Sequence, residues 1–422
     1  MRRRGGPSQQ NGVPPGVLTW MKQDVPSNAK RVLVAVSQDS AGIARLLPVL
    51  HNANCRVTVV APAGLELLSS KHYDQYAVTR NGAQGVVNAL TSGELDRAEF
   101  NFAIIADRQV LELLMSPSTP EEAKAWLPMS GSSIAGWSLP SASNFFSNAK
   151  QHNMPVPEFQ FARGPHQALK AAQELGFPLR LRLARNHAPQ SAGIIENSVM
   201  LRAVTRTIPP AATALMQHYV SGARVRTTAL MQNGFPLAWF SWKNPVDRNR
   251  GKSSRFSGTV YDHVDVEPVL HRLGKWMGFT GFCGVNWILE QETRRLYLVG
   301  FQPYPTESVH AGRRAGIDFA SVLAQTMANT ATVLRPRPRQ EVTNLAIFPE
   351  AAIEAVQERS VTLLLQSLRD APFGDPRLLA AQFRRLVSAC LRPAVAVLKG
   401  PSKTRLGVEH SSKLGTQPAS LQ

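Results

Sequence analysis

Acidic residues, cysteines and long apolar runs are scarce in this 422-residue chain. Only 29 Asp and Glu residues stand against 47 Lys and Arg residues, which gives a formal net charge of +18. The three cysteines, Cys55, Cys283 and Cys390, are too far apart to suggest a disulfide framework or a metal cluster. No apolar run reaches the roughly 18 residues of a membrane span, and the start lacks the apolar core of a secretory signal. These absences predict a cytoplasmic protein whose positive surplus attracts phosphates, nucleic acid or acidic partners.

Common nucleotide and metal motifs are also missing. The segment Ser37–Gly42, which follows the first expected strand, reads SQDSAG and lacks the Gly-x-Gly-x-x-Gly pattern of dinucleotide-binding domains. Arg250–Ser253 resembles the end of a phosphate-binding P-loop, but Val246 stands where its first glycine is required. The ten histidines show no metal-ligand spacing. Any phosphate site in this chain must therefore be built differently.

The N-terminal third of the chain has the pattern of an open α/β domain. Arg31–Val36, Arg56–Ala61 and Phe102–Ala106 are continuous apolar runs, as expected for parallel strands buried on both faces. Ala41–Leu50 lies between the first two and predicts a helix. We expect a disordered basic tail over residues 1–28, an α/β domain over 29–115 and a linker over 116–140.

The middle of the chain predicts mixed α+β structure. A helix from Pro165 to Gly176 precedes the strand Pro178–Ala184, in which leucines alternate with Arg180 and Arg182. A hairpin across Asn233-Gly234, the amphipathic helix Val266–Gly278 and a second hairpin with strands Phe282–Leu289 and Leu296–Phe301 follow. We expect one lobe over residues 141–210 and a second over 211–333.

The C-terminal part predicts a helical extension over residues 334–398. After the linker Leu334–Gln340, helices are expected over Glu350–Leu368 and Pro376–Leu391, the second with Asp375 as N-cap. Residues 399–422 are polar and predict a disordered tail.

Five segments, in this order, resemble the ATP-grasp superfamily, which includes carbamoyl-phosphate-synthetase-like enzymes and carboxylate–amine ligases. The segments are Asn153–Pro157 (NMPVP), Ala168–Ala184, Leu215–Gly222 (LMQHYVSG), Gly278–Leu289 (GFTGFCGVNWIL) and Pro303–Asp318. The resemblance implies an α/β preceding domain and two α+β lobes that clamp ATP between them. It also implies Mg²⁺ held by acidic side chains of the second hairpin.

The resemblance carries nucleotide-binding roles onto particular residues. Arg182 stands where a strand lysine would grip phosphate, with a solvent-facing strand residue as the alternative. Arg224 stands where an acid would hold ribose, and Arg185–Gly193, where a Gly-rich phosphate loop is expected, has one glycine. The nucleotide-binding candidates are Arg182, Gln217, His218, Tyr219, Val220 and Arg224. The substrate or phosphate candidates are Lys243, Lys252, Arg255 and Arg313.

The expected metal ligands are replaced. Asn286, Gly300 and Gln302 stand where the family has acids and an asparagine. Two amides and a glycine supply no negative charge, and Mg²⁺ prefers carboxylate and water oxygens. We therefore assign no metal ligand and no catalytic residue, while ATP remains an expected ligand.

Three functions remain open. The first is a non-catalytic ATP-grasp relative that binds a nucleotide or another anion, or serves as a partner subunit. The second is an active ATP-dependent carboxylate–amine or carboxylate–thiol ligase that works through an acyl phosphate. The third is a basic protein that binds nucleic acid. Substrate, partner and oligomeric state are not indicated by the sequence.

Overall fold

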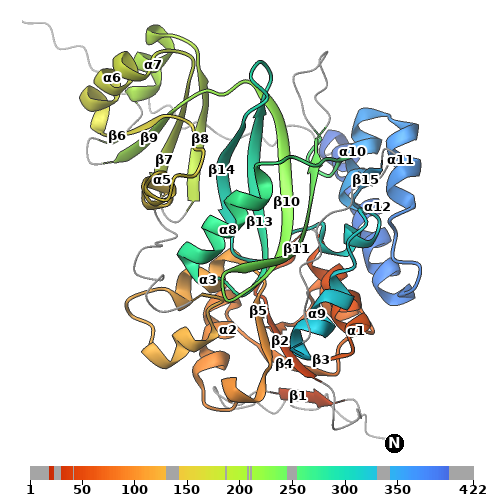
Figure 1. The fold of residues 1–422 in the computed structure, drawn as a ribbon. Helices are drawn as coiled ribbons and strands as arrows, with labels where there is room; N and C mark the ends of the chain where they lie inside the picture. Colours follow the sequence, from red (N-terminus) through yellow and green to blue (C-terminus); the bar gives the residue numbers. More distant parts are fainter. Residues whose placement is uncertain are drawn as a thin grey trace, which may run out of the picture.

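A computed structural model gives the structure of the chain and describes residues 19–22, 30–40, 42–129, 142–185, 188–206, 209, 212–244, 254–329 and 343–398. Its strands form three sheets, which lie in three successive parts of the described chain (Figure 1). The predicted class, an α/β domain followed by α+β lobes and a helical C-terminal region, is confirmed.

The first sheet has the strand order β1-β4-β3-β2-β5, in which the last four strands run parallel. Its strands are β1 (Thr19–Lys22), β2 (Lys30–Ala35), β3 (Cys55–Pro62), β4 (Gln75–Thr79) and β5 (Phe102–Ile105). β1 pairs antiparallel with β4, inside the segment that was expected to be a tail. The remainder of that tail lies outside the described residues.

Helices cover both faces of this sheet. They are η1 (Ile43–Arg45), α1 (Leu46–Asn52), η2 (Glu66–Ser69), α2 (Gly82–Thr91), η3 (Arg97–Glu99), α3 (Arg108–Leu114) and η4 (Glu121–Trp126). Val32 and Val34 pack with α1, whereas Leu33 and Ala35 pack with α2 and α3. This continuous burial is the reason why the strands are apolar at every position.

The second sheet, with the order β6-β9-β7-β8, forms the first lobe. Its elements are α5 (Ala142–Gln151), β6 (Phe159–Arg163), α6 (Gly164–Leu175), β7 (Leu179–Arg185), β8 (Ala188–Ile195), α7 (Ser198–Thr205) and β9 (Thr213–His218). β9 pairs with both β6 and β7, so this lobe extends to His218 rather than to residue 210. The expected phosphate loop Arg185–Gly193 is mostly strand, with 186–187 outside the described residues.

The third sheet, with the order β14-β13-β10-β11-β12-β15, forms the second lobe. Its elements are β10 (Gly222–Gln232), β11 (Phe235–Lys243), β12 (Ser257–Val260), α8 (Val266–Met277), β13 (Gly281–Glu290), β14 (Leu296–Gln302), η5 (Val309–Arg313), α9 (Phe319–Met327) and β15 (Asn344–Ala346). The turn residues Asn233 and Gly234 both have positive φ, as a type I′ hairpin requires. Gly278 ends α8 in the left-handed conformation, as predicted.

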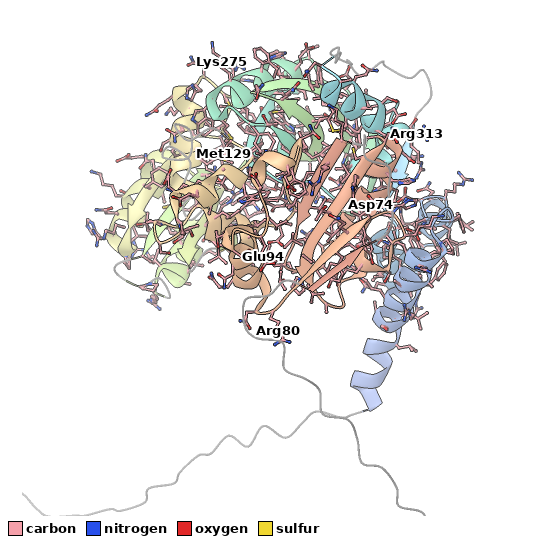
Figure 2. All side chains as sticks on the ribbon, turned by 90° about the horizontal axis from the view of Figure 1, so that it is seen from below. Asp74, Arg80, Glu94, Met129, Lys275 and Arg313 are labelled. Carbon is pink, nitrogen blue, oxygen red and sulfur yellow. The ribbon has the colours of Figure 1, made fainter. Side chains whose placement is uncertain are left out.

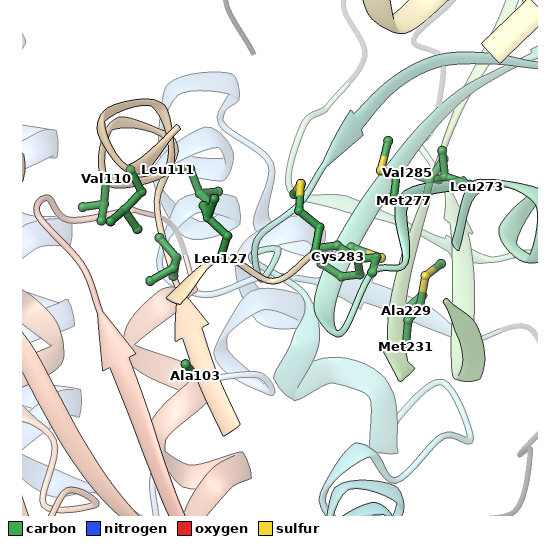
Figure 3. Close-up of a cluster of buried hydrophobic side chains, with 14 of the residues drawn as sticks. Ala103, Val110, Leu111, Leu127, Ala229, Met231, Leu273, Met277, Cys283 and Val285 are labelled. Carbon is green, nitrogen blue, oxygen red and sulfur yellow. The ribbon is translucent and has the colours of Figure 1, made fainter. Parts of the chain in front are cut away.

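One hydrophobic core cluster joins the α/β domain to the second lobe (Figure 3). Leu111 and Leu127 come from the α/β domain, while Cys283 and Met277 come from β13 and α8. The second-lobe sheet is therefore fixed on the α/β domain by shared apolar burial.

The C-terminal helices are α10 (Glu350–Glu358), α11 (Val361–Leu368) and α12 (Pro376–Leu398). The single helix expected over Glu350–Leu368 is wrong, because Arg359 takes a positive φ and Ser360 caps a new helix. Asp375 caps α12 as predicted, by accepting from the N–H of Leu378. Figure 2 shows α12 running away from the body of the molecule. Within the described residues, no helix is both long and apolar enough to cross a membrane.

Candidate functional site

The two arginines of β7 face the second lobe. Leu179 and Leu181 are buried among residues of α6 and α7, so the alternation of a strand turns Arg180 and Arg182 to the opposite face. Arg182 Nη1 lies 3.5 Å from the carbonyl oxygen of Val299 on β14. The first lobe therefore presents positive charge directly to the second.

Arg182 is a partly buried cation without a carboxylate partner among the described residues. Its guanidinium lies 5.7 Å from the ring centroid of Phe146. Burial, with a further effect from Arg180, lowers the pKa of Arg182 to about 10. A buried charge of this kind is costly unless an opposite charge or hydrogen bonds compensate it. An anion bound between the lobes would supply that compensation.

Gln217, one of the nucleotide-binding candidates, also has a buried side-chain atom without a hydrogen bond. It lies opposite Arg180 in the β7–β9 register, is 2% exposed, and its Nε2 has no hydrogen-bond partner within the described structure. The backbone N–H groups of His218 and Tyr219 already donate to the carbonyls of Glu158 and Pro178. These two N–H groups are therefore not free to bind a ligand.

β10 contributes two further arginines on the face that looks toward β7. Arg224 and Arg226 are two residues apart and therefore share a face. Burial lowers the pKa of Arg226, and the nearby Arg255 and Arg224 lower it further, while Glu307 opposes the shift. Burial together with Arg224 also lowers the pKa of Arg180.

These mutual effects define an arginine row that crosses from the first lobe to the second. Its members, in order, are Arg182, Arg180, Arg224, Arg226 and Arg255. Within the described residues, only Arg226 forms an ion pair with a carboxylate, that of Glu307. Such a concentration of positive charge favours a multiply charged anion.

The predicted substrate or phosphate residues do not all lie near the arginine row. Arg255 belongs to the arginine row, and its backbone N–H donates to Glu354. Lys243 lies opposite Val225, on the sheet face away from Arg226, with its Nζ 4.9 Å from the Tyr261 ring centroid. Arg313 pairs with Asp318, and Lys252 lies outside the described residues.

The hairpin of β13 and β14 brings the predicted metal positions together. Asn286 lies opposite Gly300, and Gly284 lies opposite Gln302. On the other side of β13, Asn286 lies opposite Arg226, so the guanidinium arises from the neighbouring strand on the same face. All of these residues except Gly300 line one small cavity, together with Thr228, Thr306, Glu307 and Ser308.

No family model and no curated protein matches the sequence. Solved structures are similar in fold. N5-carboxyaminoimidazole synthetase from Staphylococcus aureus in complex with ADP matches with a TM-score of 0.52 and 15% identity, over 72% of this chain and 78% of that chain. An N5-carboxyaminoimidazole ribonucleotide synthetase in complex with ADP matches with a TM-score of 0.54 and 12% identity, over 80% of this chain and 86% of that chain. Biotin carboxylase from Campylobacter jejuni matches with a TM-score of 0.51 and 15% identity, over 74% of this chain and 73% of that chain. All three are ATP-grasp proteins.

This chain has the ATP-grasp fold. The identities are too low to transfer an activity, because function resides in particular side chains rather than in a fold. Within this fold, the arginine row lies where the β7 strand of the first lobe faces the β10 strand of the second.

The Mg²⁺ that the ATP-grasp fold implies does not fit the residues present. The cavity at the metal position has a volume of about 10 Å³, roughly the space of one water. Its one carboxylate, Glu307, is engaged by Arg226. The hydroxyls of Thr228, Thr306 and Ser308 bond one another at 2.7 to 3.2 Å. No group of three acidic, His or Cys side chains suited to a metal occurs among the described residues.

Arg226 is the site residue that sequence reasoning missed. Its neighbour Arg224 was identified only by its place in the family pattern. The alternation of side chains along β10 could have revealed Arg226, because a strand residue two places from a site residue lies on the same face. The contact with Glu307, 81 residues later, was not visible in the sequence.

Proposed function

We propose that this protein binds a nucleotide or another polyphosphate anion between its ATP-grasp lobes and does not catalyse ATP-dependent ligation. The observation that carries the proposal is the partly buried guanidinium of Arg182 at the junction with β14, which has no carboxylate partner in the described structure. Proteins rarely retain such a charge without compensation. Its position at the junction of the lobes favours a ligand over a purely structural role.

The number of arginines supports a polyphosphate over a singly charged anion. ATP carries about four negative charges, which a ligase of this class neutralises with lysines and Mg²⁺. Here Arg180, Arg182 and Arg224 have no carboxylate partner among the described residues. Arginine holds phosphate through a planar fork of donors, so these residues suit that ligand class.

The absence of ligation follows from the chemistry at the hairpin. Acyl-phosphate formation requires the γ-phosphate to be neutralised and positioned as it moves. Asn286 and Gln302 carry no charge, and Glu307 is already paired. An active ligase would instead need Asn286, Gln302 and Glu307 to form a negatively charged metal site.

Calorimetric titration of the full chain with ATP, ADP, AMP and inorganic tripolyphosphate tests the binding. We expect saturable binding that strengthens with the number of phosphates. Arg182→Gln should weaken it about tenfold or more. Arg202→Gln on α7 is the matched control, since it removes the same charge from an exposed residue of the same lobe.

Four outcomes would contradict the proposal. Equal affinity for AMP and tripolyphosphate, or no binding of any of them, would contradict a polyphosphate site. ADP release from Mg²⁺-ATP in the presence of amino acids and carboxylic acids would instead support an active ligase. Binding of random DNA with a steep salt dependence, and no binding of tripolyphosphate, would support the nucleic-acid alternative.

A further inference from the structure

The magnesium position of the ATP-grasp fold holds a cation that belongs to the protein itself. Arg226 lies opposite Asn286 in the β10–β13 register and lines the small cavity with Gly284 and Gln302. We infer that the Arg226 guanidinium takes the place of the divalent cation, so that this chain binds polyphosphate without Mg²⁺. The inference rests on the proposed polyphosphate site and specifies how its charge is neutralised.

Arg226 is held firmly in this position. Its guanidinium is bonded to Glu307 and lies 5.6 Å from the ring centroid of Trp242, which is fully buried. The side chains of Arg226 and Glu307 are 20% and 16% exposed, so solvent screens the pair only partly. The cation therefore remains in place in the absence of a ligand.

The partner of Arg226 is fixed from the α/β domain. Gly42 approaches the backbone of Glu307 so closely that a Cβ there would lie 2.2 Å from the Glu307 carbonyl oxygen. This approach packs the α/β domain against the backbone of Glu307, whose carboxylate is bonded to Arg226 on β10. Two domains thus determine where the guanidinium lies.

Mg²⁺ and Arg226 would compete for one space. A six-coordinate Mg²⁺ with its waters needs far more room than the cavity of about 10 Å³ provides. Mg²⁺ would also cancel about two of the four charges of ATP, which weakens its attraction to the arginine row. We therefore expect Mg²⁺ to leave the affinity unchanged or to lower it.

The first experiment titrates the full chain with ATP and with tripolyphosphate, in EDTA and in excess Mg²⁺. The inference predicts binding in EDTA that is at least as tight as in Mg²⁺. Affinity that rises about tenfold or more with Mg²⁺ would overturn it. Absence of binding in both buffers would overturn the proposed function as well, so the two failures are distinguishable.

The second experiment changes the charge at the pair. Glu307→Gln frees Arg226 from its counter-ion and should tighten tripolyphosphate binding in EDTA several-fold. Glu292→Gln, in the exposed turn of the same hairpin, is the matched control and should have no such effect. If the Arg226–Glu307 pair is purely structural, Glu307→Gln should not increase the affinity for tripolyphosphate. A weaker or unchanged affinity in Glu307→Gln would therefore contradict a direct role for Arg226.

The third experiment uses Mn²⁺ alone as a probe. Arg226→Glu would place a second carboxylate beside Glu307, Asn286 and Gln302, and should create one Mn²⁺ site detectable by electron paramagnetic resonance. The wild-type chain should show none. Stoichiometric Mn²⁺ binding by the wild type at this hairpin, or none by a folded Arg226→Glu variant, would overturn the inference. Arg226→Lys, which keeps the positive charge, should retain metal-free binding, and circular dichroism checks that both variants fold.

Discussion

The guanidinium of Arg182 on β7 lies 3.5 Å from the carbonyl oxygen of Val299 on β14 and meets no carboxylate among the described residues. The two ATP-grasp lobes therefore approach each other at a positive charge that the protein itself leaves unneutralised. The pKa of Arg182, lowered to about 10 by burial and by Arg180, shows that the folded state disfavours this charge. A ligand anion would reverse that effect.

Arg182→Met should stabilise the free protein while it impairs binding. The flexible apolar side chain fills similar space without a partly buried charge, and we expect a gain of about 1 kcal/mol in the free energy of unfolding. The melting temperature should rise by roughly 2–4 °C without ligand, and the increase caused by tripolyphosphate should disappear. Differential scanning calorimetry with and without tripolyphosphate measures both effects.

The exposed Arg202→Met is the control for that experiment. It should leave both the melting temperature and its ligand-dependent increase unchanged, because Arg202 lies on the helix layer of the lobe. If Arg182→Met lowers the stability of the free protein, Arg182 contributes to the fold rather than to a binding site.

Glu350 should make stability depend on pH. It is 5% exposed at the start of α10, and burial raises its pKa from 4.5 to about 7, although Arg385 lies 2.6 Å away and opposes the shift. Arg385 is shared with Glu66, whose negative charge also disfavours ionisation of Glu350. The folded state therefore holds a proton that the unfolded state releases above pH 4.5.

The sign of this effect follows from proton linkage. Stability contributed by Glu350 is present below pH 4.5 and is lost as the pH rises toward 7. Between pH 5.5 and 7.5 the wild type should lose about 2 kcal/mol that Glu350→Gln retains. Urea denaturation of both proteins at these two pH values measures the difference. Equal pH dependence in the two proteins would contradict the raised pKa.

Asp370 should be a principal attachment of the C-terminal helices. This 4% exposed residue accepts from Arg45, His310, Arg314 and the N–H of Phe348. Asp370→Asn leaves buried positive and donor groups without their shared acceptor and should cost about 3–5 kcal/mol.

Urea denaturation and limited proteolysis check the role of Asp370. The substitution should make α10–α12 more accessible to protease, whereas Asp262→Asn at an exposed position should not. Affinity for tripolyphosphate should be retained in the folded fraction. A loss of less than about 1 kcal/mol would contradict a central role for Asp370.

Gly42→Ala should disturb the site through the backbone. Gly42 has φ 74°, and its Cβ would collide with Glu307. Gly64→Ala is a matched control, since Gly64 has φ 86° and no heavy atom within 4 Å of a Cβ. Gly64→Ala should cost about 1 kcal/mol from backbone strain alone, and Gly42→Ala about 2–4 kcal/mol. Only Gly42→Ala should change the affinity for tripolyphosphate, which calorimetry would reveal.

Local signals in the sequence were sufficient to predict much of the fold. Asn233-Gly234 and the Gly278 cap depend on neighbours within a few residues, and both were predicted correctly. β1 pairs with β4, about 55 residues later, and neither strand was predicted from its own pattern. The break at Arg359 was missed because no glycine or proline marks it.

The site was harder to predict because its contacts link distant segments. Position in the family pattern selected Arg182 and Asn286 as candidates, but it could not show that Arg182 would lie against the Val299 carbonyl of β14. The arginine row exists because β7 and β10 face each other, and Glu307 is bonded to Arg226 across 81 residues of sequence. Sequence reasoning identified the replaced acids but not Arg226, which lies opposite Asn286 on the neighbouring strand.

A crystal structure of the full chain with ATP, grown in EDTA, would test the central claim most directly. The account predicts the ATP phosphates between the lobes, within hydrogen-bond distance of the guanidinium groups of Arg182 and Arg226, with no metal ion beside Asn286. Phosphates held elsewhere, or a metal ion between them and the β13–β14 hairpin, would contradict it.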